Sequence, residues 1–543
     1  MREHATGAAT ASASLALGAV LVLPFLLRPT ANLLDREGEP LAIVTPHNEP
    51  IRYEFARAFR AHMQGKGRAV RIDWRVPGGS NEITRFLASE YAVSFERYWK
   101  THAGLPWTSR VAAAFASPAM QPNEEGPDEH HERLARRMFL GSDAGIGIDL
   151  FFGGGTQDSI LHAAAGRLVD SGIVRSHPEL FHDAGIPEKV GGEPYWDKDG
   201  RWVGACLSGY GICYNRDSLT RLGIEQVPSS WADLADPIYF GQIALADPSK
   251  SGSSAKAFEM VIQQQMNARA AELASEGAAM VDLESRAPAE GWDRAMRLIR
   301  RISANARYFS DSAPKIPLDV AVGDAAAGMC LDFYGRFQSE ASSTGAGTRL
   351  GFITPAGGTS MNADPIGLLR GAPHRELALE FLEFVLSPEG QKLWNFKVGT
   401  PGGPERYALR RLPILPELYA AAYEPLRSDP TEQPYEQARS FTYHESWTGA
   451  LYRTIAFVVR VMCVDVHDDL GRAYRALSAN GFPPHATALF DDVAVVDYAA
   501  AKSRIRSALT SPNPVDEVVL ANELLDGFRS QYRRVAELAR EGG

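Results

Sequence analysis

The stretch IDLFFGGGTQDSILHAAA at 148–165 decides the fold class of this chain. Its apolar start, 148–152, predicts a buried strand, the glycines at 153–155 predict a tight turn, and a helical pattern follows from Thr156. Glycine allows backbone N–H groups to come close to a ligand, and a helix N-terminus carries partial positive charge. The turn lacks the Lys of a nucleotide-binding P-loop and the spacing of a dinucleotide-binding turn, so neither site is predicted.

The same order of strand, turn and helix recurs along the chain, at 41–59, 69–87, 242–264 and 365–386. Alternating strands and helices predict an α/β fold, in which mainly parallel sheets are covered by helices on both faces. Such sheets bind ligands beyond the carboxyl ends of their strands, where these turns must lie. The repetition predicts a cleft that suits an anionic or strongly polar ligand. The alternative is that each turn only caps its own helix.

The turns supply the first candidate ligand-binding residues. They are His47, Asn48, Ser80, Gly154, Gly155, Thr156, Ser251, Gly252 and Ser253. Together they would line the cleft with hydroxyl groups, backbone N–H groups and helix N-termini, all of which donate hydrogen bonds to an anion.

The composition argues against several classes of protein. The chain has 543 residues, of which 45% are hydrophobic, so it is long enough to bury at least two cores. Its formal net charge of −10 and its lack of a basic block argue against nucleic-acid binding. Four cysteines are too few for a disulfide scaffold, and none of them forms the C-x-x-C pair of a structural zinc site.

The N-terminal segment, 1–39, predicts export. Arg2 precedes an uncharged stretch, 5–27, and Arg28 ends it. This order is typical of a secretory signal peptide, and the stretch is also long enough to act as an uncleaved membrane anchor. A disordered apolar leader is the alternative. Export would place the body of the protein in the periplasm or another extracytoplasmic compartment.

Several segments between 40 and 405 together resemble a periplasmic solute-binding protein of an ABC importer. They follow the order of that family: a first strand and turn, the ligand loop quoted above, a strand that crosses between lobes, a segment from S-W-x-D-L to an S-G turn, a helix with its following strand, and a late helix. The segments are 41–49, 148–173, 201–224, 228–254, 320–337 and 378–394.

The resemblance implies the type II periplasmic-binding-protein fold, with two interleaved α/β lobes joined by crossing strands. Lobe one would comprise 40–205 and 355–404, with an insertion at 91–140. Lobe two would comprise 206–354. A helical C-terminal region, 405–543, would pack on lobe two.

The resemblance also implies a function without catalysis. A monomer would bind its solute between the lobes, close around it and deliver it to an ABC permease in the membrane. Tyr210, between Gly209 and Gly211, would lie on the hinge strand and face the ligand, although a tyrosine buried in the sheet is the alternative. Two other functions stay open: a ligand-sensing subunit of a signalling system, and an enzyme on the same fold.

Within the family the closest resemblance is to the ferric-ion-binding group, which implies particular site residues. His47 matches the metal-binding His after the first strand, and Tyr334 matches the second of two adjacent metal-binding tyrosines. Ser251 and Gly252 match the turn that holds an anion. The resemblance therefore implies iron(III) as a candidate transported ligand, bound by His47 and Tyr334.

Two positions depart from the ferric pattern. Phe333 stands at the first tyrosine, and Gly154 stands at the glutamate. Fe³⁺ prefers several anionic oxygen ligands, so His47 and Tyr334 form an incomplete set unless water, an anion or a chelator completes it. Alternation in a strand would turn Asp332 to the same side as Tyr334 and make it a further oxygen donor. A small anion or an anionic organic solute is the alternative ligand.

Overall fold

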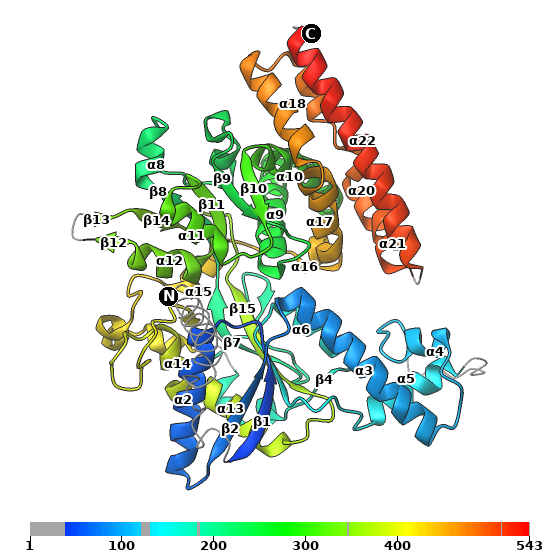
Figure 1. The fold of residues 1–543 in the computed structure, drawn as a ribbon, viewed down its shortest axis with the longest axis vertical. Coiled ribbons are helices and arrows are strands. Elements are labelled where there is room, and N and C mark those ends of the chain that lie inside the picture. The colour runs from blue at the N-terminus through cyan, green and yellow to red at the C-terminus, as the bar shows by residue number, and fades with distance from the viewer. Residues whose placement is uncertain (1–37, 121–130, 182–184, 345–346, 512, 542–543) are drawn as a thin grey trace, which may run out of the picture.

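Two β-sheets, each covered by helices, form the centre of the molecule (Figure 1). The computed structural model describes residues 38–120, 131–181, 185–344, 347–511 and 513–541. The predicted signal peptide or anchor lies almost entirely outside the described residues, which begin at 38. Each sheet has its own buried hydrophobic cluster, and this confirms the predicted two-lobed α/β fold.

The first sheet belongs to lobe one, and its strands follow the order β16-β7-β15-β3-β1-β2, with β4 also paired to β15. The strands are β1 (Glu39–Val44), β2 (Val70–Arg75), β3 (Leu150–Phe152), β4 (Leu168–Val169), β7 (Val203–Ser208), β15 (Asn362–Leu369) and β16 (Leu412–Pro413). β1 is parallel to β2 and β3, whereas β15 is antiparallel to β3, β4 and β7. β3 is an unbroken apolar run because both of its faces are buried.

The second sheet belongs to lobe two, and its order is β10-β9-β11-β8-β14. The strands are β8 (Tyr210–Asn215), β9 (Ile243–Ala246), β10 (Ala306–Ser310), β11 (Ala327–Leu331) and β14 (Leu350–Ile353). β9 is parallel to β10 and β11, whereas β8 is antiparallel to β11 and β14. The prediction of mainly parallel sheets is therefore wrong, since both sheets are mixed. The alternation of strands and helices does not show whether a strand that leads from one sheet to the other, such as β7 or β8, pairs in the parallel or the antiparallel direction.

Four helices begin at the turns that the sequence singled out. They are α2 (Glu49–Gly65) after β1, α3 (Ser80–His102) after β2, α6 (Thr156–Ala165) after β3, and α9 (Gly252–Ser275) after β9. Asn48, Gly79, Gly155 and Ser251 take the N-cap positions, which favour small polar residues and glycine. Local capping preferences therefore place the start of each helix.

Most of the remaining helices of the two lobes pack around the sheets. In lobe one they are α4 (Ser109–Ala114), α5 (Glu132–Gly141), α7 (Ile173–Ser176), α13 (Arg375–Leu386), α14 (Pro388–Asn395) and α15 (Pro434–Arg439). In lobe two they are α8 (Arg216–Arg221), α10 (Met280–Ala304), α11 (Lys315–Val322) and α12 (Asp332–Ala341). Two short hairpins complete the strands, namely β5 (Lys189–Val190) with β6 (Glu193–Pro194), and β12 (Ser343–Thr344) with β13 (Gly347–Thr348).

The chain crosses between the lobes three times in the described residues. The first crossing is a single residue, Gly209, between β7 and β8. β7 extends to Ser208, so this crossing lies after the predicted boundary at 205. The second crossing is 354–361, between β14 and β15, and the third is 440–444, between α15 and the C-terminal helices. Short crossings of this kind restrict the motion of the lobes to rotation about a hinge.

The region predicted as an insertion, 91–140, extends a long helix. α3 runs without interruption from the first sheet to His102, and α4 and α5 pack beside its far half, away from the sheets (Figure 1). Tyr91, Phe95 and Trp99 recur every four residues along α3 and are fully buried in this cluster. The apolar spacing thus joins the outlying helices to one face of the first sheet, since the same cluster includes Val44 of β1 and Phe151 of β3.

The C-terminal region divides between the lobes. β16 pairs with β7 in the first sheet, so the prediction that all of 405–543 packs on lobe two is wrong for its first part. The later part does pack on α9 and α10 of lobe two (Figure 1). Its helices are α16 (Glu445–Thr448), α17 (Tyr452–Val459), α18 (His467–Ala479), α19 (Pro484–Phe490), α20 (Tyr498–Ala500), α21 (Arg506–Thr510) and α22 (Pro514–Glu541). The sequence pattern around Leu412 and Pro413 cannot show that these two residues pair with the distant strand β7.

One segment in the described part of the chain, Glu445–Val464, is long and apolar enough to cross a membrane. However, 67% of its most apolar window is buried against the rest of the protein. Ile455, Val458 and Val459 are fully buried in the core of lobe two. The segment is therefore part of the core of lobe two.

Gly291 allows α9 and α10 to approach closely. A Cβ at this position would lie 2.4 Å from the Cα atom of Met266 in α9. We expect Gly291→Ala to lower the free energy of unfolding by about 1–3 kcal/mol, because the two backbones would have to separate. Chemical denaturation of the purified protein measures this change.

Gly527→Ala in α22 is the matched control. A Cβ on Gly527 would meet nothing within 4 Å, so alanine should leave stability unchanged or raise it by about 0.5–1 kcal/mol. Equal effects of the two substitutions would contradict the close packing of α9 on α10.

Candidate functional site

A cavity of about 680 Å³ lies between the two sheets and is lined by residues of both lobes. Its volume is in the range occupied by small organic ligands. Every predicted ligand-binding residue except Asp332 lines it. These residues are His47, Asn48, Ser80, Gly154, Gly155, Thr156, Tyr210, Ser251, Gly252, Ser253 and Tyr334. The fold thus brings the candidates together, and their role in binding stays a prediction.

The N-termini of α2, α3, α6 and α9 all begin at the wall of this cavity, where Asn48, Ser80, Thr156 and Gly252 line it. First-turn N–H groups have no partner within their helix, and they carry partial positive charge. Ordinary capping satisfies some of them. The Asn48 side chain accepts a hydrogen bond from the N–H of Ile51 at 3.3 Å, whereas α3 has no side-chain cap. Capping and a role in ligand binding are therefore compatible.

The glycine turn before α6 has a structural cause of its own. Gly153 and Gly154 both have a φ of 96°, in the region that side chains avoid. A Cβ on Gly153 would lie 2.7 Å from His47 Nε2, so only glycine leaves room for the His47 ring. The glycine turn therefore provides the space that the His47 ring occupies.

His47 belongs to a buried polar cluster with Asp364 and Arg411. His47 Nε2 lies 3.3 Å from Asp364 Oδ2, and the Arg411 guanidinium forms an ion pair with the same carboxylate. Burial lowers the pKa of His47, which favours the neutral ring. Burial opposes ionisation of Asp364, but the Arg411 charge outweighs it and holds the pKa of Asp364 below its usual value. Within the described residues His47 Nδ1 and Asp364 Oδ1 have no hydrogen-bond partner, although both atoms are buried.

The prediction that Asp332 supplies an oxygen donor is wrong. Asp332 is the first residue of helix α12, so the alternation of a strand does not apply to it. Its buried carboxylate accepts hydrogen bonds from Arg336 Nη2 at 2.8 Å and from the N–H of Phe333 at 2.7 Å. Since the carboxylate is already paired and does not line the cavity, it is not a candidate ligand-binding group.

The donors around His47 suit a bare ferric ion poorly. Burial raises the pKa of Tyr334, which disfavours the tyrosinate that Fe³⁺ would need. The Arg411 cation lies in the same cluster, where it would repel a metal ion. In the part of the chain that the structure describes, no group of three or more His, Cys, Asp or Glu residues could hold a metal.

Arg52, one helical turn after Asn48, was not predicted as a site residue. It lines the cavity, and no carboxylate within the described residues pairs with it. Lys250 pairs with Asp311 at 2.7 Å, and the other two lysine or arginine residues of the lining, Lys256 and Arg411, also form ion pairs. The spacing of Asn48 and Arg52 on one helix face is a signal from which sequence analysis could have found it. Arg52 is therefore the cavity cation most available to an anion.

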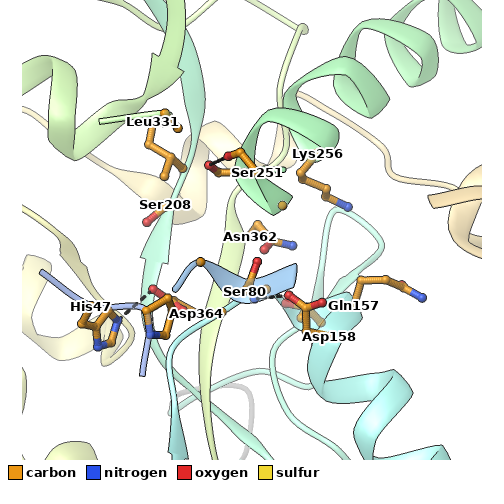
Figure 2. Close-up of a pocket in the computed structure, with 18 of the residues that line it drawn as sticks. His47, Ser80, Gln157, Asp158, Ser208, Ser251, Lys256, Leu331, Asn362 and Asp364 are labelled. Carbon is orange, nitrogen blue, oxygen red and sulfur yellow. Dashed lines mark hydrogen bonds and ion pairs between the residues drawn. The ribbon is translucent and has the colours of Figure 1, made fainter. Parts of the chain in front are cut away.

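Asp158 is a buried carboxylate at the start of α6, and it too was not predicted (Figure 2). It accepts hydrogen bonds from the N–H of Gly155 at 3.2 Å and from Thr84 Oγ1 at 3.4 Å, and it also interacts with Ser80. Burial raises its pKa to about 6 despite these bonds. The cavity wall thus holds an acid that titrates near neutral pH.

The two lobes touch each other at one side of the cavity. Asn81 Nδ2 of α3 donates a hydrogen bond to the carbonyl oxygen of Ser249 at 3.3 Å. Ser80 Oγ lies so close to Gly252 that a Cβ on this glycine would be 2.4 Å away. Figure 2 shows Ser251, the N-cap of α9, and Lys256 on α9 opposite Ser80 and Asp158. The positively polarised starts of α3 and α9 therefore meet, and an anion between them would lower their repulsion.

Comparison with known proteins finds a family that part of the chain resembles. Residues 148–412 match a family model described as "Bacterial extracellular solute-binding protein". This match confirms the predicted resemblance to solute-binding proteins. It includes Thr156, Tyr210 and Arg411, whereas His47 and Ser80 precede it.

Two relatives match parts of the chain. An uncharacterized protein of Haemophilus influenzae is 25% identical over 246 residues, which are 45% of this chain and 60% of that protein. The phosphoglycerate transport regulatory protein PgtC of Salmonella typhimurium is 22% identical over 191 residues, which are 35% of this chain and 40% of that protein. The chain therefore spans less than two thirds of the length of these relatives.

Two solved structures show more distant likenesses. The periplasmic binding protein AfuA of Actinobacillus pleuropneumoniae, solved with fructose-6-phosphate bound, is 19% identical, with 66% of this chain and 82% of that chain covered and a TM-score of 0.43. Iron-bound HitA of Pseudomonas aeruginosa is 14% identical, with 78% of this chain and 99% of that chain covered and a TM-score of 0.45. Likenesses at this level do not decide between an iron and a phosphate ligand.

Asp158→Asn should change how stability depends on pH. The pKa of Asp158 rises from 3.8 to about 6 on folding, so its stabilising contribution is fully present below pH 3.8 and is lost as pH rises through about 6. Asparagine still accepts hydrogen bonds and carries no charge. We expect the variant to exceed wild type in free energy of unfolding by up to about 3 kcal/mol at about pH 8, and the difference to vanish near pH 4.

Urea denaturation across this pH range measures the effect, with Asp217→Asn as the control. Asp217 is an exposed carboxylate of α8 that does not line the cavity. A constant difference between Asp158→Asn and wild type at all pH values would show that Asp158 does not titrate in this range.

Proposed function

We propose that this chain is an extracytoplasmic solute-binding protein that binds a small organic anion between its lobes and delivers it to an ABC permease. The match of 148–412 to the extracellular solute-binding family supports this class of function. One observation carries the choice of an anion. Four helix N-termini and the unpaired Arg52 line one cavity between the lobes.

Charge complementarity favours an anion over a ferric ion. Arg52 lacks a carboxylate partner in the described chain, whereas Arg411 in the same cavity is paired with Asp364. His47 is favoured in its neutral form, and Tyr334 is disfavoured as tyrosinate. These groups donate hydrogen bonds to an anion more readily than they replace the oxygen ligands of Fe³⁺. Iron(III) would need a chelating anion that fills the same cavity.

The size of the cavity favours an organic ligand. Its volume of about 680 Å³ is far larger than a single inorganic anion occupies. Phosphate monoesters combine an anionic group with an organic body, and the name of the relative PgtC refers to the transport of phosphoglycerate. We take phosphate esters as the first ligands to test.

Delivery to a permease follows from closure of the lobes. The contacts from Ser80 and Asn81 to the turn before α9 exist only when the lobes meet. A ligand that stabilises this arrangement shifts the population toward the closed form, and a permease can recognise that form by its surface. The protein would act as a monomer outside the cytoplasm, where the predicted N-terminal signal or anchor directs it.

A ligand-sensing subunit is the second candidate function. The word regulatory in the name of PgtC favours it, and the long C-terminal helices provide surface for a partner. Pull-down of a permease rather than of a receptor or kinase separates the two functions. Absence of turnover of a bound phosphate ester would separate both from an enzyme on the same fold.

Arg52→Ala should weaken the binding of a phosphate ester. The substitution removes a charge-assisted contact, so we expect the dissociation constant for glucose 6-phosphate to rise about tenfold to a hundredfold. Isothermal titration calorimetry of the purified protein measures it, with 3-phosphoglycerate, inorganic phosphate and ferric citrate as further ligands.

Arg85→Ala is the control for the loss of one positive charge. Arg85 lies on α3, is exposed and pairs with Glu82 rather than lining the cavity. Its substitution should change affinity less than about twofold, since exposed ion pairs contribute little. Tight binding of ferric citrate without binding of any phosphate compound would refute the proposed ligand class.

A further inference from the structure

The C-terminal region forms part of the cavity wall, although it lies beyond the segment that matches the solute-binding family. That match ends at residue 412, whereas Tyr443, Glu445 and Tyr452 line the cavity. The Tyr452 hydroxyl group donates a hydrogen bond to the carbonyl oxygen of Gly252 at 2.6 Å. Gly252 is the first residue of α9, so Tyr452 touches one of the four helix starts at the cavity.

Buried hydrogen bonds hold this part of the chain firmly on α9. Glu259, with 1% of its surface exposed, accepts hydrogen bonds from the Tyr443 hydroxyl group at 2.9 Å and from Thr448 Oγ1 at 2.5 Å. The fully buried Gln263 donates to the carbonyl oxygen of His444 at 2.8 Å and accepts from its N–H at 3.0 Å. Since unpaired buried polar groups are costly, these bonds make the segment a fixed wall of the cavity.

The chemistry of this wall differs from that around Arg52. Tyr210 and Tyr443 present aromatic surface to the cavity. Lys256 Nζ lies 2.9 Å from Glu193, 3.0 Å from Glu259 and 3.9 Å from the centre of the Tyr443 ring. Two carboxylates and one ammonium group leave an excess of negative charge. The carboxylates of this wall that line the cavity are Glu193 and Glu445. The wall therefore repels a second anionic group, while these carboxylates and the aromatic rings suit hydroxyl groups and a carbon skeleton.

We propose that Tyr443 and Tyr452 bind the uncharged, hydroxyl-bearing body of the ligand, while Arg52 and the N-terminus of α2 bind its anionic group. This inference rests on the anion-binding function proposed above and names the substrate class within it. The class is a sugar or polyol that carries one phosphate group. A bare inorganic anion lacks the body, and an organic anion with a second charged group meets repulsion at the tyrosine wall.

The test compares two probes, glucose 6-phosphate and inorganic phosphate, by calorimetry on the full chain without its N-terminal segment 1–37. Wild type should bind glucose 6-phosphate more tightly than inorganic phosphate. Tyr452→Ala should lower its affinity for glucose 6-phosphate about tenfold and change that for inorganic phosphate less than about twofold. Tyr452→Phe keeps the ring, so this variant should keep the preference for glucose 6-phosphate over inorganic phosphate. Tyr452→Leu keeps apolar bulk without the ring, and it supplies the comparison if the alanine variant does not fold.

Tyr498→Ala is the matched control, because Tyr498 belongs to the C-terminal helices but does not line the cavity. It should leave the preference unchanged. The inference is overturned if both Tyr452→Ala and Tyr452→Leu still prefer glucose 6-phosphate to inorganic phosphate. It is also overturned if Tyr498→Ala abolishes this preference as fully as Tyr452→Ala does, or if wild type binds the two probes equally tightly. In each of these cases anion binding itself still stands. Wild type that binds neither probe refutes the proposed phosphate-binding function and the substrate class together.

Discussion

The convergence of four helix N-termini on one cavity is the constraint on which the rest of the structure depends. Their partial charges have the same sign, and the starts of α3 and α9 touch across the cavity. Asp158 supplies a negative charge at this place, yet burial makes its ionisation costly, as a pKa of about 6 shows. The carboxylate is therefore a partial substitute for a bound anion.

The mixed sheets explain how two lobes build one site. Strands β7 and β8 are joined by a single residue, Gly209, so the lobes stay close at the hinge and meet again at Ser80 and Gly252. The third crossing brings the C-terminal helices back to lobe two, where Tyr443 and Tyr452 complete the wall. A region outside the matched family segment thus shapes the same cavity as the family segment itself.

Local sequence patterns predicted the elements of the site better than the contacts between them. The turns at Asn48, Gly155 and Ser251 were found because capping and glycine preferences act over a few residues. Strand direction was missed, since pairing with a distant strand leaves no periodic signal. Asp332 was misplaced because a strand was assumed where α12 begins. Arg411 joins Asp364 only through the pairing of β16 with β7, and no short-range pattern reveals that pairing.

Helix α3 joins the cavity to the outlying helices without a break. Its 23 residues run from Ser80, which touches α9, to His102 at its far end. At about 1.5 Å per residue this is a rod of roughly 35 Å. Its buried rings, Tyr91, Phe95 and Trp99, stiffen it against bending. A tilt of a few degrees at the cavity would therefore displace the far tip by several ångströms, so solute binding of the kind proposed would change the external shape of the protein.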